Sequence, residues 1–99
     1  MTAYSSVRFR VKPGQEQRFE QLFLAAPRDF EGLRKMVLNK SPDGTYFSIG
    51  EWDTFQHMVD ARERMKANLN SFRDTLEDLG DGRGVTDPIS GEAIFEKTR

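Results

Sequence analysis

Cysteine is absent from the chain, and histidine and tryptophan occur once each, as His57 and Trp52. Without cysteine there can be no disulfide, no thiolate metal site and no cysteine nucleophile. The first twenty residues hold no apolar run typical of a signal peptide, and no stretch is apolar for long enough to predict a membrane span. We therefore expect a cytoplasmic protein with no membrane partner.

An excess of positive charge is also missing. Fifteen Lys and Arg residues stand against 16 Asp and Glu residues, which gives a formal net charge of -1, and the charges are mixed along the chain. A nucleic-acid-binding protein needs a basic face, so we expect no nucleic acid as the main partner. The length of 99 residues suits one domain, residues 1–99, and the eight phenylalanines are many for a single small core.

What is present is a regular alternation of strand and helix patterns. Strands predicted from period-two alternation cover residues 4–11, 32–40, 45–53 and 88–96. On the third strand, Tyr46 and Trp52 share one face while Phe47 and Ile49 share the other. Helical spacing predicts a helix over about 14–28, and the turn at Ser41-Pro-Asp-Gly44 makes residues 32–53 a hairpin.

The longest pattern covers residues 54–80, where apolar side chains recur at alternating spacings of three and four. Thr54 is placed to cap this helix. The pattern fits one long helix, or two helices separated near Lys66–Asn68, because Asn68 or Asn70 could cap a new start. We expect the break, and we expect the helix to end at Gly80.

The element order predicts a ferredoxin-like βαββαβ domain of the α+β class, an antiparallel sheet with its helices on one face. The other sheet face would carry Phe47 and Ile49, and an exposed apolar face is typical of an interaction site. We expect two such sheets to pack face to face in a homodimer. Arg8 and Arg10 would lie near that interface, where Glu51 could neutralise them across the strands.

Three segments resemble the antibiotic biosynthesis monooxygenase (ABM) superfamily, the small dimeric α+β barrels. They are residues 7–14 leading into an amphipathic helix, the strand 46–52, and Glu51-Trp-Asp-Thr54 opening the next helix. The resemblance extends over nearly the whole chain. It implies a homodimer with a pocket between the sheet and the helices of each subunit. Some members are monooxygenases that turn phenolic intermediates into quinones without metal or flavin, so the resemblance implies that no cofactor is needed.

Other members of that superfamily degrade heme, and their pattern is only partly present. Their tryptophan at the end of the third strand matches Trp52. Their first-strand asparagine falls on Val7, and their heme-ligand histidine falls near Arg62. The single histidine, His57, comes too early. We therefore do not expect heme degradation.

Three residues are candidates for chemistry in such a pocket. Trp52 could stack on an aromatic substrate, or it could simply close the core. Arg62 lies on the apolar stripe and could stabilise a phenolate, or it could bury its stem and reach water. His57 has an unperturbed pKa near neutrality and could act as a base, although it lies beside the stripe and could be a surface residue.

Four further residues are candidate substrate-binding residues. Tyr46 shares a face with Trp52, and Ser5 lies on the helix-facing side of the first strand. Asn68 could bind a ligand carbonyl or cap a helix, and Phe72 could line a pocket or pack the core. No calcium loop, dinucleotide loop or other metal site has the required spacing. The function we expect is a small-molecule-binding homodimer acting as a cofactor-independent monooxygenase on an aromatic or enolisable substrate. The alternative is a non-catalytic ligand-binding or assembly module.

Overall fold

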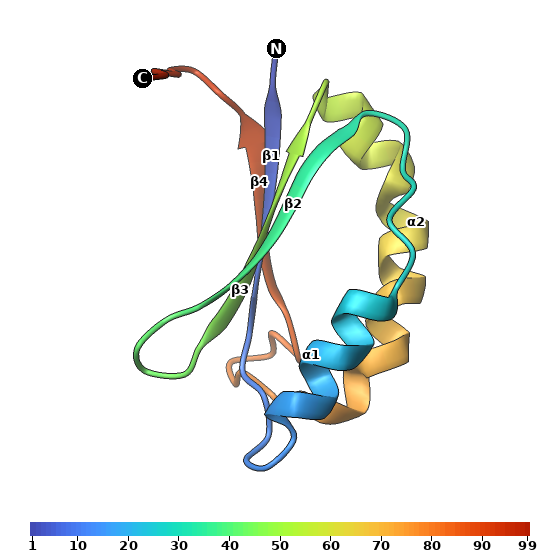
Figure 1. Cartoon of the computed structure of the whole chain (residues 1–99), viewed down its shortest axis with the longest axis vertical. Coiled ribbons are helices and arrows are strands. Elements are labelled where there is room, and N and C mark those ends of the chain that lie inside the picture. The colour runs from blue at the N-terminus through green and yellow to red at the C-terminus, as the bar shows by residue number, and fades with distance from the viewer.

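The computed structural model describes residues 1–99 and confirms the ferredoxin-like prediction. The sheet is antiparallel in the order β2-β3-β1-β4, and both helices lie on one face of it (Figure 1). The elements are β1 (Ala3–Phe9), α1 (Glu16–Ala25), β2 (Leu33–Lys40), β3 (Tyr46–Trp52), α2 (Phe55–Phe72) and β4 (Asp87–Glu92). Neither helix combines the length and the apolar character that a membrane span requires.

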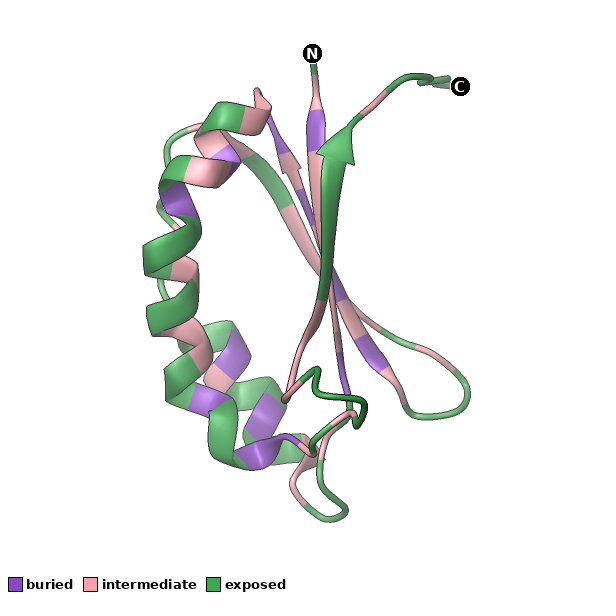
Figure 2. Ribbon diagram, turned by 180° about the vertical axis from the view of Figure 1, so that it is seen from behind, coloured by how far each residue is buried: buried purple, intermediate pink, exposed green.

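The two faces of the sheet differ as the alternation predicted. On β3, Tyr46, Ser48 and Trp52 are buried beneath the helices, whereas Phe47 and Ile49 on the other face stay half-buried. The edge strand β4 is exposed over most of its length (Figure 2). The helices therefore cover the middle of the sheet and leave the β4 edge open.

Two separate clusters of buried side chains hold the helices to the sheet. The first is built mostly from aromatic rings and consists of Phe9, Phe19, Phe23, Tyr46, Phe72 and Leu76. Its rings meet mainly at tilted or edge-to-face angles, a favourable arrangement for aromatic pairs. The second cluster consists of Ala3, Phe30, Trp52, Met58 and Ala61. One cluster contains side chains of α1 and the end of α2, and the other contains the start of α2.

The predicted break in the second helix is wrong. Helix α2 is continuous from Phe55 to Phe72, and Thr54 caps it as predicted by accepting a hydrogen bond from the backbone N–H of His57 at 3.1 Å. Asn68 does not cap a second helix. Its Nδ2 instead donates to the carbonyl oxygen of Pro27 at 2.8 Å, outside the helix.

The predicted helix end at Gly80 is also wrong. A short 3-10 turn, Arg73–Thr75, follows α2, and the chain then runs extended beside the segment after β1. The N–H of Lys12 donates to the carbonyl of Thr75 at 2.8 Å, and the N–H of Glu77 donates to the carbonyl of Arg10 at 2.7 Å. This pairing of distant segments supplies hydrogen bonds that another turn of helix would have supplied.

The open sheet face carries a different ion pair from the one predicted. Arg8 pairs with Asp87 of the neighbouring strand at 3.0 Å, not with Glu51. Glu51 accepts a hydrogen bond from the hydroxyl of Tyr4, its register partner on β1, at 3.3 Å. Arg10 lies beyond the end of β1 and is exposed. Strand β1 therefore neutralises its arginine through β4 and not through β3.

Candidate functional site

A cavity of about 780 Å³ lies between the inner face of the sheet and α2. Its floor includes Ser5 and Val7 of β1 and Ser48 of β3. Its helical wall includes Met58, Met65 and Leu69 of α2, and the segment before β4 contributes residues 83–86. Cavities of about 300–1,000 Å³ are the usual size for small-molecule sites. The volume therefore suits a small organic ligand.

The hollow exists because the side chains between the two clusters are small. Ser5 and Ser48 stand where larger residues would have filled the space beneath α2. Phe9, Phe23 and Phe72 of the first cluster line the cavity, and so do Phe30 and Met58 of the second. The cavity therefore lies between the two clusters, with phenylalanine rings contributed from both.

Two hydroxyl groups make the floor polar at the centre. Ser5 Oγ accepts a hydrogen bond from Trp52 Nε1 at 3.0 Å. A hydroxyl that accepts one bond still has its own O–H to donate. Ser48 is buried with 6% of its surface exposed and supplies the second hydroxyl. An oxygen atom on a ligand could accept hydrogen bonds here.

Trp52 does not line the cavity. Its side chain is fully buried, and its ring stacks on Phe30 with the ring centroids 6.0 Å apart and the planes 12° from parallel. Phe30 is the aromatic residue of this pair that faces the cavity. Trp52 therefore contacts two residues of the cavity lining, Phe30 and Ser5, without lining the cavity itself.

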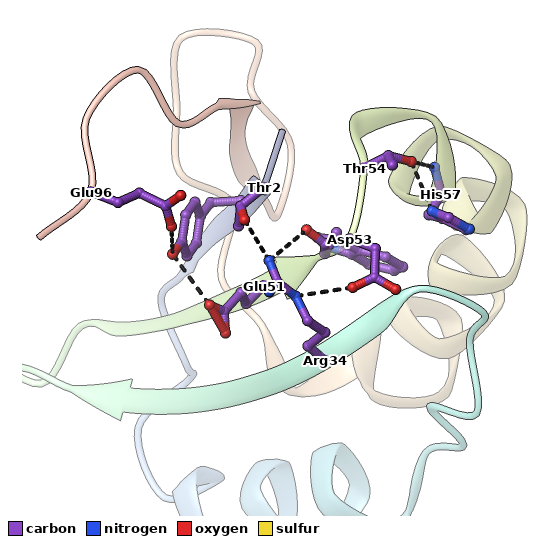
Figure 3. A network of polar contacts seen from close by, with 9 residues as sticks. Thr2, Arg34, Glu51, Asp53, Thr54, His57 and Glu96 are labelled. Carbon is purple, nitrogen blue, oxygen red and sulfur yellow. Dashed lines mark hydrogen bonds and ion pairs between the residues drawn. The ribbon is translucent and has the colours of Figure 1, made fainter. Parts of the chain in front are cut away.

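His57 and Tyr46 also lie outside the cavity lining. His57 Nδ1 is 2.7 Å from Thr54 Oγ1 (Figure 3). The Nε2 of His57 is 4.0 Å from Glu31 Oε1. The His57 ring packs so closely on Gly32 that a side chain there would collide with it. The Tyr46 hydroxyl donates to Glu20, and burial, followed by this bond, raises the pKa of Tyr46 to about 12.

Four of the predicted site residues do meet at the cavity: Ser5, Arg62, Asn68 and Phe72. Arg62 is exposed on α2, with its guanidinium carbon 6.0 Å from the ring centroid of Phe55. Phe72 is buried and belongs to the first cluster as well. Sequence periodicity placed these side chains on the correct faces, and the cavity brings them together.

The charged residues of the lining are all basic. They are Arg28, Arg62, Lys66, Arg73 and Arg83, and the lining includes no aspartate, glutamate or histidine. Burial lowers the pKa of Arg28, whose Nη1 donates to the carbonyls of Phe23 at 2.6 Å and Ala26 at 3.0 Å. Sequence reasoning missed Arg28, Arg73 and Arg83. The only available signal was the Gly82-Arg-Gly84 loop, which gives no hint of a facing cavity.

A second polar network lies at the end of β3, outside the cavity (Figure 3). Arg34 Nε pairs with Asp53 at 3.1 Å, and its Nη2 donates to Thr2 Oγ1 at 2.6 Å. The Tyr4 hydroxyl lies 3.3 Å from both Glu51 and Glu96, and its pKa is raised by burial and by the two carboxylates. No group of three or more metal-ligating side chains occurs in the structure. This network ties the N-terminal strand to its neighbours.

Comparison with solved structures identifies the fold. Rv0793 from Mycobacterium tuberculosis superposes with a TM-score of 0.77 at 14% sequence identity, covering 99% of this chain and 100% of that one. A protein from Bordetella bronchiseptica, provisionally named an antibiotic biosynthesis monooxygenase, gives a TM-score of 0.75 at 17% identity, with coverages of 95% and 98%. A dimeric ferredoxin-like protein from an uncultured marine organism gives a TM-score of 0.76 at 12% identity, with coverages of 99% and 92%.

No family model and no curated protein matches the sequence. The structural matches nevertheless extend over nearly the full length of both chains, and several of the matched proteins carry the same provisional name. The predicted resemblance is thereby confirmed at the level of fold. The chain therefore has the same ferredoxin-like fold as these solved structures, several of which are provisionally named antibiotic biosynthesis monooxygenases.

Proposed function

We propose that the cavity binds an aromatic or enolisable small molecule and that the protein oxygenates it with dioxygen, without a cofactor. The observation that carries this proposal is the cavity itself, about 780 Å³ between phenylalanine and methionine side chains, with two serine hydroxyls on its floor. Apolar walls with a few placed polar groups are typical of a site that orients a small ligand. The fold and the provisional names of its structural neighbours agree with this reaction class.

The reaction needs an electron-rich substrate. A substrate with an acidic CH₂ beside a phenol or ketone loses a proton, and the resulting anion gives electrons to dioxygen. One oxygen atom becomes a carbonyl in place of the CH₂, and the other leaves as water with the two hydrogens, so the atoms balance. Ser5 and Ser48 would donate hydrogen bonds to the substrate oxygen, and Arg62 would stabilise the anion. The walls would hold water away from it.

Oxygen uptake with 1,8-dihydroxy-9-anthrone tests the proposal. We expect the protein to raise uptake and quinone formation above the protein-free rate of autoxidation. Ser48→Leu fills the floor and should abolish the increase, whereas Ser48→Ala keeps the space and should leave a reduced rate. Equal rates for wild type and Ser48→Leu would show that any activity does not arise in the cavity.

One observation favours the second candidate, a non-catalytic binding module. The lining holds no histidine and no carboxylate, so it contains no ordinary side-chain base to take the substrate proton. The oxygenase proposal therefore requires a substrate that loses its proton readily in water, without a base from the protein. Binding of the anthrone without any rise in oxygen uptake would favour the module over the oxygenase.

We also propose that the protein is a homodimer joined through the open sheet face. Val37, Phe47 and Ile49 leave apolar surface half-exposed on this face. A hollow of about 270 Å³, lined by Tyr4, Lys35, Val37, Ile49 and Glu51, could receive side chains from a second copy. The marine protein of the same fold is dimeric by name. A single domain that works in the cytoplasm stays our prediction from the sequence.

A further inference from the structure

Eight of the ten arginines of this chain fall into two groups by their partners, and the other two, Arg10 and Arg99, are exposed, form no ion pair and do not line the cavity. Arg8, Arg18, Arg34 and Arg64 each form an ion pair with an aspartate, at 2.6–3.1 Å, and none of the four lines the cavity. Arg28, Arg62, Arg73 and Arg83 line the cavity, and none forms an ion pair. Unpaired guanidinium groups are thus concentrated around the cavity.

This concentration sets the electrostatic potential of the cavity. The chain as a whole has a formal net charge of -1, yet the cavity lining contains five basic side chains and no acidic one. Charges of one sign around a low-dielectric cleft focus the field and raise the local concentration of the opposite ion. The cavity therefore attracts anions, although the protein is close to neutral.

Three of the four arginines are free to bind a ligand. Arg28 is committed to the carbonyls at the end of α1, and its guanidinium lies 4.0 Å from the ring centroid of Phe23. The other three are Arg62 of α2, Arg73 of the 3-10 turn and Arg83 of the glycine loop, and we call them the arginine rim. All three are exposed as well as lining the cavity, so they lie where the cavity meets solvent.

We infer that the ligand of this cavity is an aromatic carboxylate, whose rings lie between the phenylalanine and methionine side chains and whose carboxylate binds the arginine rim. The inference rests on the proposed small-molecule function and names its substrate class. A guanidinium presents several N–H donors in a plane, a geometry that matches a carboxylate. Only the Nε of Arg73 donates a hydrogen bond, to Asn70 Oδ1 at 3.2 Å, so the two terminal nitrogens of its guanidinium are free.

Calorimetric titration with three ligands of one shape tests the charge requirement. The ligands are 2-naphthoate, neutral 2-naphthamide and cationic 2-naphthylmethylammonium. We expect naphthoate to bind on the order of tenfold more tightly than naphthamide, and the cation to bind least. Added salt should weaken the binding of naphthoate and leave that of naphthamide unchanged, because only the charged ligand is screened.

Variants assign this preference to the rim. Arg62→Gln, Arg73→Gln and Arg83→Gln should each weaken naphthoate binding by about threefold, the scale of an exposed ion pair, and leave naphthamide binding unchanged. Arg10→Gln is the matched control, because Arg10 is exposed and has no ion pair but does not line the cavity. It should change neither affinity.

The outcomes separate the two proposals. Equal affinities for naphthoate and naphthamide would overturn the carboxylate inference and leave the small-molecule site in place. A preference for naphthoate that survives removal of all three rim arginines would also overturn it. If none of the three ligands binds the wild-type protein, the inference and the proposed function fail together.

Discussion

Trp52 and Ser5 lie on neighbouring strands, and the indole Nε1 of Trp52 donates a hydrogen bond to the hydroxyl oxygen of Ser5 at 3.0 Å. The tryptophan is fully buried, and the serine lies on the floor of the cavity. This one contact links the second buried cluster to the candidate site. It also orients the serine hydroxyl, because the oxygen accepts from the indole and keeps its own hydrogen to donate.

Removing this acceptor should destabilise the fold. Ser5→Ala leaves the indole N–H of Trp52 buried without a partner, and we expect the free energy of unfolding to fall by about 1–3 kcal/mol. Urea unfolding followed by the fluorescence of Trp52 measures it, since the chain has no other tryptophan. Ser6→Ala, on the same strand with its side chain on the other face, should cost less than about 0.5 kcal/mol. Equal losses for the two variants would contradict the role given to the bond.

Gly50 protects the same contact by having no side chain. A Cβ at this position would lie 2.8 Å from Ser5 Oγ and 3.0 Å from Trp52 Nε1, closer than atoms pack without displacement. Gly50→Ala should therefore destabilise by about 1–3 kcal/mol, the usual cost of overpacking, and shift the emission of Trp52. Gly91→Ala is the matched control, because nothing lies within 4 Å of a Cβ there. If Gly50→Ala left the free energy of unfolding unchanged, the strands would have to move apart without cost, which would contradict this prediction.

A charge on the open sheet face should separate the proposed dimer. Ile49→Lys places an ammonium group at the centre of the apolar face, where a second sheet would have to desolvate it. We expect sedimentation analysis to give a dimer for the wild type and a monomer for Ile49→Lys. Leu24→Lys, on an exposed position of α1, should stay dimeric. A wild-type monomer, or a dimer for both variants, would contradict the proposed interface.

Tyr46 predicts how stability changes at high pH. Its folded pKa of about 12 lies above the ordinary tyrosine value of 10.0, so folding favours the neutral phenol. The stabilisation is complete below pH 10.0 and is lost as the pH rises to about 12. Tyrosinate absorbance in a Tyr4→Phe background, which leaves Tyr46 as the only tyrosine, should show ionisation near 12 when folded and near 10.0 in urea. A folded-state midpoint at 10.0 would contradict the buried hydrogen bond to Glu20.

The sequence predicted the faces of the sheet well, because alternation depends only on which side of a strand is buried. It placed Ser5, Tyr46 and Trp52 on the inner face, where the structure has them. It could not predict that Phe30, from the loop before β2, would lie against Trp52 and take its place in the cavity lining. A loop residue has no periodicity to place it.

The predicted boundaries of the second helix were wrong for a similar reason. Leu76 continues the helical spacing, but pairing with Val11 draws it out of the helix. That pairing joins segments far apart in the chain, and local spacing carries no information about it. Two of the three arginines of the rim were missed for the same reason, although Arg62 was predicted. Arg73 and Arg83 come from a turn and a loop, and only the tertiary fold places them with Arg62 in the lining of one cavity.

The methionine methyl groups test the central claim, that the cavity is a ligand site, most directly. Met36, Met58 and Met65 line the cavity, and Met1, the only other methionine, is 74% exposed at the N-terminus. Methyl-labelled methionine can be followed by NMR during a titration with 2-naphthoate. We predict saturable shifts at Met36, Met58 and Met65, with Met1 unchanged. Unchanged signals from all three cavity methionines would contradict it.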